Sequence, residues 1–216
     1  EAIRQALEPD GKQWGEGLTR VYDAVARDYL YGNVNNILLM LGNHDMDRIA
    51  DVVKDQDPRR VKLANTLLAT MRGIPQVFYG DEYAMKSADR RLGHSTLRMP
   101  LPLGEAVTEE MQDMFDYQSR LFQWRKGEPV IHTGRTMHFM SRDNTYAFFR
   151  YNDSEAVFVF ANASEENRTI PTTNYAEIFS KYNAVGQDVI TGKTYDLSRQ
   201  DIVIPALTSI VVKLSK

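Results

Sequence analysis

The sequence predicts an α/β segment followed by an all-β segment, and two observations support this prediction. Up to about Lys126 the apolar residues recur at helical spacing, with two short apolar runs between the helical stretches. After a break at residues 126–129, which contains Gly and Pro, the spacing changes to the alternation of half-buried strands. We therefore expect two domains, residues 1–126 with helices and parallel strands, and residues 127–216 with an antiparallel β-sandwich.

The first segment contains three amphipathic helical faces and two apolar runs. The runs, residues 37–41 and 74–79, are bounded by turn residues, as buried parallel strands should be. The order helix, strand, helix, strand, helix is typical of a β/α layered fold. The three helical faces consist of Leu18, Val21, Tyr22, Val25 and Tyr29; of Val61, Ala64, Leu67, Leu68 and Met71; and of Met111, Met114, Phe115, Leu121 and Phe122.

The second segment contains six candidate strands separated by turn signals, in a region whose size is typical of a small sandwich. Its aromatic residues alternate along the strands, which favours a role in the core over stacking on sugars. We therefore expect a chiefly structural domain that binds glucan weakly at most. The candidate strands are residues 136–141, 145–151, 156–161, 168–170, 201–204 and 207–214, and the aromatic residues are Phe148, Phe149, Phe158 and Phe160.

Composition excludes several classes of protein. The 216 residues carry a formal net charge of −3, and no run of Lys and Arg is long enough to follow a nucleic-acid backbone. No apolar run is long enough to span a membrane. With no cysteine, disulfides and thiolate metal sites are excluded, and the localisation stays open. The chain begins at Glu1, without Met and within a helical pattern, so we expect a piece of a longer protein.

A polar triplet, Asn43, His44 and Asp45, follows the first apolar run directly. Side chains at the carboxyl end of a parallel barrel strand face the ligand, and catalytic groups of that fold sit there. A second interpretation is that Asp45 caps a helix over residues 46–53. The spacing alone leaves both interpretations open.

Residues 40–48 resemble the fourth signature region of the α-amylase family, glycoside hydrolase family 13, in which an apolar pair and a variable residue precede Asn-His-Asp. Met40 stands where that family commonly has Phe. Residues 73–82 are similar to the family's eighth-strand region, Gly-x-Pro-x-x-x-Tyr-Gly-x-Glu, and a predicted helix over 59–71 separates the two motifs. The resemblance implies that residues 1–126 form the C-terminal part of a (β/α)₈ TIM barrel, ahead of the β-sandwich.

A third similarity concerns residues 93–104, which resemble a loop of neopullulanase- and cyclomaltodextrinase-like enzymes. In that loop an Arg is followed by an Asp-Phe-Pro-Gly stretch. Arg98 and Pro102 match this pattern, whereas Pro100 occupies the Asp position.

The family resemblance implies specific roles for individual residues. Family members cleave α-glucosidic bonds with retention, and Asp45 would be the third carboxylate, which stabilises the transition state. The resemblance places the nucleophile and the acid/base upstream of Glu1. His44 would donate to a glucose hydroxyl. The further candidate substrate-binding residues are Asn43, Arg48, Glu82 and Arg98, of which Asn43 and Arg48 could instead hold the loop.

The expected function is hydrolysis, with retention, of α-1,4-glucosidic bonds in starch-like oligosaccharides such as maltooligosaccharides. Cleavage of α-1,6-glucosidic bonds stays open. A related transglycosylase and a non-catalytic, amylase-like binding or accessory protein stay open as alternatives. We expect the chain alone to be inactive and to self-associate through its barrel strands. We expect no cofactor and no metal site in this chain, and calcium stays open for the complete enzyme. The three histidines outside the triplet lack metal-ligand spacing; they are His94, His132 and His138.

Overall fold

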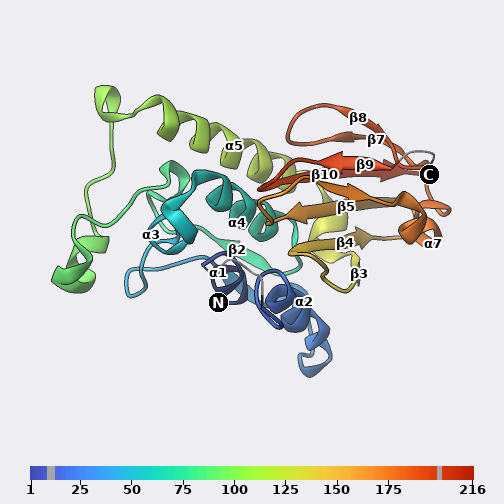
Figure 1. Ribbon diagram of the computed structural model, residues 1–216, viewed down its shortest axis with the longest axis horizontal. Helices are drawn as coiled ribbons and strands as arrows, with labels where there is room; N and C mark the ends of the chain where they lie inside the picture. The colour runs from blue at the N-terminus through green and yellow to red at the C-terminus, as the bar shows by residue number, and fades with distance from the viewer. Residues whose placement is uncertain (9–12, 199–200) are drawn as a thin grey trace.

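The computed structural model describes residues 1–8, 13–198 and 201–216. A mainly helical part occupies one side of the molecule and a mainly β part the other (Figure 1). The helical part begins at the N-terminus and contains two short strands between its helices, in the predicted order. Its elements are α1 (Ala2–Leu7), α2 (Thr19–Ala26), β1 (Leu38–Met40), α3 (Ile49–Val52), α4 (Pro58–Thr70), β2 (Ile74–Gln76) and α5 (Glu109–Lys126).

The strands β1 and β2 pair in parallel, which confirms the predicted arrangement. Leu38 lies opposite Ile74, and α4 forms the crossover between the two strands. The expectation that both strands are buried is wrong, because Leu38 and Ile74 are each 52% exposed. Tyr29 was also misplaced, because α2 ends at Ala26 and Tyr29 is exposed.

The β part contains a six-stranded antiparallel sheet in the order β3-β4-β5-β10-β7-β8, and a two-stranded antiparallel sheet of β6 and β9. Short helices, α6 (Pro129–Thr133) and α7 (Ala176–Phe179), accompany the sheets. The strands are β3 (Arg135–His138), β4 (Thr145–Tyr151), β5 (Glu155–Asn162), β6 (Arg168–Ile170), β7 (Val185–Asp188), β8 (Thr194–Asp196), β9 (Ile202–Ile204) and β10 (Thr208–Ser215).

The central strands of the six-stranded sheet, β4, β5 and β10, are buried on both faces. One face packs against the helical part, so that Phe148 and Val159 share a core with residues of α4 such as Leu67. The other face packs against α7 and the smaller sheet, around Phe149 and Phe158. The predicted core role of the sheet aromatics is confirmed.

Candidate functional site

A tight turn follows β1 and projects His44 and Asp45 away from the protein. The Asn43 side-chain oxygen accepts a 2.8 Å hydrogen bond from the backbone N–H of Asp45. The backbone N–H of Met46 donates to the Asn43 carbonyl at 3.3 Å, which closes the turn. As a result the side chains of His44 and Asp45 are 59% and 60% exposed. Asn43 therefore shapes the turn, while its two neighbours face solvent.

The alternative role of Asp45 as a helix cap is wrong. The helix α3 begins only at Ile49, and the residue at its cap position is Arg48, in an extended conformation. No side chain caps this helix. The predicted helix over residues 46–53 is therefore shorter than expected, and the Asp45 carboxylate serves no part of it.

Arg4, a residue of α1, binds the backbone at both ends of the turn. Its guanidinium donates to the carbonyl of Leu41 at 2.8 Å and to the carbonyl of Asp47 at 2.6 Å, one on each side of the turn. Arg4 is buried, and hydrogen bonds from a charged donor are stronger than neutral ones. The two ends of the turn are thus fixed relative to each other.

A second buried arginine, Arg48, connects the turn to two loops behind it. Its guanidinium donates to the Asp81 carboxylate at 3.0 Å, to the Tyr79 carbonyl at 2.9 Å and to the Leu97 carbonyl at 2.7 Å. The same guanidinium lies 4.6 Å from the centroid of the Phe78 ring, a distance typical of a cation–π contact. The Arg48 guanidinium therefore binds groups of the protein itself.

Asp81 is the buried carboxylate of this arrangement. Burial raises its pKa to about 6, against the opposing effect of the Arg48 guanidinium. Asp81 reaches Arg48 because Gly80 takes a left-handed conformation, with φ of 89°. A Cβ at Gly80 would lie 2.4 Å from the Met85 sulfur, so a side chain there would be both strained and crowded.

Two further predicted residues lie near the turn in different ways. Glu82 is turned back on its own loop, where its carboxylate accepts a 2.7 Å hydrogen bond from the backbone N–H of Gly80. Arg98 donates to the His94 carbonyl at 3.0 Å, and its guanidinium lies 3.5 Å from the Asp45 carboxylate. His44 is 3.1 Å from the same carboxylate.

The structure therefore brings three of the six predicted site residues together at the surface, His44, Asp45 and Arg98. Asn43, Arg48 and Glu82 bind protein groups behind or beside them, and their role toward a substrate stays a prediction. Arg4 was missed, because nothing in the pattern of α1 indicates which loop its side chain reaches.

Among the described residues no group of three or more His, Cys, Asp or Glu side chains is placed to hold a metal ion. The part of the chain that the structure describes also contains no helix with the length and apolarity needed to cross a bilayer. The arrangement at the turn offers a carboxylate, Asp45, with an imidazole 3.1 Å away and a guanidinium 3.5 Å away. Such a set can grip a polyhydroxylated ligand.

Comparison with known proteins shows that the chain is similar to parts of α-amylases and glucanotransferases. A family model described as the cyclo-malto-dextrinase C-terminal domain matches residues 136–213. The chain is 26% identical over 199 residues to an α-amylase of Niallia circulans, which covers 88% of this chain and 35% of that protein. It is also 26% identical over 168 residues to a 4-α-glucanotransferase of Thermotoga maritima, covering 66% of this chain and 36% of the relative.

Among solved structures, the chain resembles the α-amylase of Geobacillus thermoleovorans complexed with acarbose. The TM-score is 0.75 at 20% sequence identity, and the match covers 100% of this chain and 46% of that chain. This similarity confirms the predicted fold class, the C-terminal region of an α-amylase-type barrel followed by antiparallel sheets. The chain spans less than half the length of each of these three relatives.

Proposed function

We propose that this chain, a relative of the α-amylase-family glycoside hydrolases, forms part of the active site of an enzyme that cleaves α-glucans with retention. The observation that carries the proposal is the state of Asp45. Its carboxylate is exposed at the carboxyl end of β1, on a turn that the buried Arg4 holds in place, and among the described residues it pairs only with the exposed His44 and Arg98. Barrel enzymes place catalytic groups at this end of the strands.

In this proposal Asp45 stabilises the transition state. Cleavage of a glucosidic bond passes through a flattened sugar ring that gains positive charge. A fixed carboxylate that binds the sugar hydroxyls interacts more strongly with that state than with the substrate, and this difference lowers the barrier. His44, 3.1 Å from Asp45, would donate to a hydroxyl of the same sugar.

Positioning is the role that we assign to the residues behind the turn. Arg4 and Arg48 fix the turn and its neighbouring loops through backbone carbonyls. Arg98 flanks the Asp45 carboxylate and would orient it toward the sugar. Asn43 sets the shape of the turn through its side-chain oxygen.

Two more carboxyl groups are needed for retaining hydrolysis, a nucleophile and an acid/base roughly 5–5.5 Å apart. The neighbouring carboxylates do not fit these roles, because Asp81 pairs with Arg48 and Glu82 accepts from the Gly80 backbone. We therefore propose that further β/α units of a complete enzyme supply both groups. On this basis the present chain alone does not turn over α-glucans.

The experiment that tests this function is incubation of the complete enzyme with maltotriose, with the present chain alone as the control. Glucose and maltose should appear with the complete enzyme and be absent with the chain alone. Proton NMR of fresh products should show the α-anomer first, as retention requires. If the complete enzyme releases no sugar, the non-catalytic alternative holds and the proposal fails.

A transglycosylase is the second candidate, because one relative is a 4-α-glucanotransferase. The turn around Asp45 would serve both reactions, since both pass through the same charged sugar. Product lengths separate them in the same incubation. Transfer gives oligosaccharides longer than maltotriose, whereas hydrolysis gives only shorter ones.

A further inference from the structure

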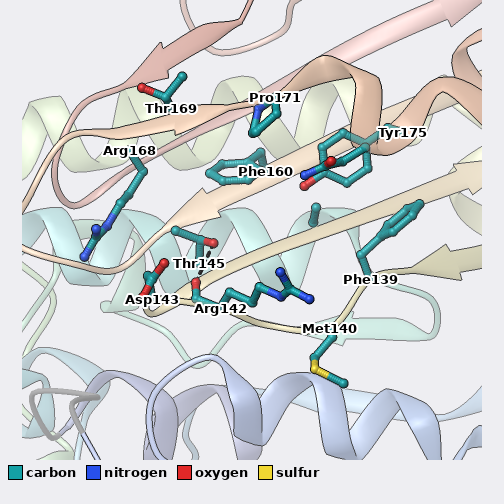
Figure 2. A pocket seen from close by; sticks show the side chains of 12 residues that line it. Phe139, Met140, Arg142, Asp143, Thr145, Phe160, Arg168, Thr169, Pro171 and Tyr175 are labelled. Carbon is teal, nitrogen blue, oxygen red and sulfur yellow. Dashed lines mark hydrogen bonds between the residues drawn. The ribbon is translucent and has the colours of Figure 1, made fainter.

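The β part contains an open hollow that is distant in sequence from the turn around Asp45. Its volume is about 560 Å³, within the usual range of small-molecule sites. The lining comes from the β3–β4 connection, from β4, β5 and β6, and from the loop before α7 (Figure 2). The residues that line it include Phe139, Arg142, Asp143, Ala147, Asn174 and Tyr175.

The floor of the hollow is apolar and aromatic. Phe139 and Tyr175 contact each other edge to face, with ring centroids 4.7 Å apart. On the sheet, Ala147 lies directly opposite Phe160 in the β4–β5 pair. Because the alanine is small, it leaves space beside the phenylalanine ring that a larger side chain on β4 would fill.

The rim of the hollow is polar and well held. Asp143 and Asn144 take left-handed conformations, with φ of 49° and 55°, and form the two-residue hairpin turn before β4. The Asn144 side chain accepts from the backbone N–H of Leu18 at 3.0 Å and donates to the Ala163 carbonyl at 3.0 Å. A rim fixed in this way loses little conformational freedom when it binds a ligand.

Several polar groups at the hollow are free to bind a ligand. Within the described part of the chain, the Arg142 guanidinium, the Asp143 carboxylate and the Asn174 amide have no side-chain hydrogen bond or ion pair. Arg168 differs, because it is engaged with Ser164 at 3.0 Å and with Glu166 at 3.3 Å. The free charges at the rim therefore balance, one positive and one negative, which favours a neutral ligand over an anion.

We propose that this hollow binds a neutral α-glucan chain. Phe139 and Tyr175 would contact the apolar face of a sugar ring, and Arg142, Asp143 and Asn174 would bind its hydroxyls. Aromatic rings beneath donors and acceptors of both signs suit a ligand with apolar faces and many hydroxyls. The hollow and the neutral polyol follow from the geometry, whereas the α-linkage rests on the proposed function. This proposal departs from the expectation that the domain binds glucan weakly at most, because these polar side chains line one hollow.

The test is a titration of the full chain with maltohexaose, followed by ¹H–¹⁵N NMR. The backbone signals of Arg142, Asn174 and Tyr175 should shift. The double variant Arg142→Ala/Asn174→Ala should bind about tenfold more weakly there, because two hydrogen bonds are lost. Arg135→Ala is the matched control, since Arg135 is exposed on the edge strand β3 and does not line the hollow. It should bind as the wild type does.

A second variant, Ala147→Leu, fills the hollow without removing a polar group, and it should weaken binding while all rim side chains remain. Cellohexaose, the β-linked counterpart, should bind more weakly than maltohexaose. Three results would overturn the proposal. The NMR signals of the hollow residues do not shift in the wild type, the double variant binds as the wild type does, or both sugars bind equally well. These outcomes concern signals of the hollow alone, so they are distinct from loss of maltotriose turnover by the complete enzyme.

Discussion

The helical part, which carries the turn around Asp45, differs from the β part in the contacts that stabilise it internally. In the helical part buried arginines grip backbone carbonyls. Arg125 alone donates to the carbonyls of Ala69 at 2.6 Å, Met71 at 3.2 Å and Gly73 at 2.6 Å, where α4 turns into β2. Such contacts fix loop positions, because a planar guanidinium accepts few arrangements of its partners.

The outer core of the β part is held by packed rings instead. Phe158 lies 4.8 Å from Phe149 and 5.3 Å from Phe179, measured between ring centroids. These contacts stabilise chiefly through buried apolar area. The difference indicates that packed rings stabilise the outer face of the sheet, whereas the position of the functional turn depends on polar clamps.

The largest effect is expected where the packed rings are removed. Phe158→Ala should lower the free energy of unfolding by about 4 kcal/mol, because the side chain is fully buried and leaves a cavity. Urea unfolding measures this change. The exposed substitution Val203→Ala in β9 is the control and should cost well under 1 kcal/mol. A small effect at Phe158 would contradict the assignment of stability to the aromatic core.

A slightly smaller effect is expected at the clamp on α4. Arg125→Met keeps the apolar stem but leaves three carbonyls without their donor, and should cost about 3 kcal/mol. Hydrogen exchange should rise in β2 more than in β5. Arg27→Met, at an exposed position, is the matched control. Equal exchange in both strands would show that the clamp does not act locally.

The buried carboxyl of Asp81 should make stability depend on pH. Its folded pKa of about 6 lies above the unfolded value of about 3.9. The folded protein therefore binds more protons between these values, and the contribution of Asp81 to stability is present below pH 4 and lost as pH rises through 6. We expect this group to lower the free energy of unfolding by roughly 2–3 kcal/mol between pH 4 and pH 7.

The variant Asp81→Asn isolates that contribution, since the amide does not titrate. The free energies of unfolding at pH 4.5 and pH 7, obtained from urea titrations, should differ less in Asp81→Asn than in the wild type, by roughly 2 kcal/mol. Asp23→Asn, an exposed carboxylate on α2, should leave the pH dependence as it is. A pH profile that is identical in wild type and Asp81→Asn would mean that Asp81 keeps an ordinary pKa.

The smallest effect on stability is expected at the exposed strand pair. Leu38→Lys replaces a half-exposed apolar side chain on β1 and should change the free energy of unfolding by about 0.5 kcal/mol or less. Its effect on association should be larger, because unpaired strands with apolar faces invite pairing between copies. Light scattering should show less self-association than in the wild type. A wild-type chain that is already monomeric would contradict this expectation.

Much of the fold could be predicted because its signals are local. Residues 145–151 and 168–170 were expected as strands with the observed bounds, since their alternation is clear. The strands β7 and β8 were missed. They are short and polar, and they form because β7 pairs with β10 and β8 in turn pairs with β7. Gly186 shows this dependence, because a Cβ there would lie 2.2 Å from the Lys213 carbonyl.

The candidate site also contains one feature that a local sequence pattern predicts and others that it does not. The turn itself could be located, because polar residues directly after an apolar strand stand out in the sequence. The clamps could not, since Arg4 reaches a loop 37 to 43 residues away and Arg48 meets Asp81 33 residues away. Pairings over such separations depend on the packed structure rather than on any local pattern.

The most direct test of the central claim is the turnover of the Asp45→Asn variant in the complete enzyme, measured with soluble starch. The amide keeps the shape of the side chain but loses its charge, so turnover should fall by roughly 100-fold or more. The urea midpoint should stay unchanged, because among residues 1–8, 13–198 and 201–216 the Asp45 side chain pairs only with its exposed neighbours His44 and Arg98. Asp23→Asn serves as the control. Wild-type turnover in Asp45→Asn would contradict the account.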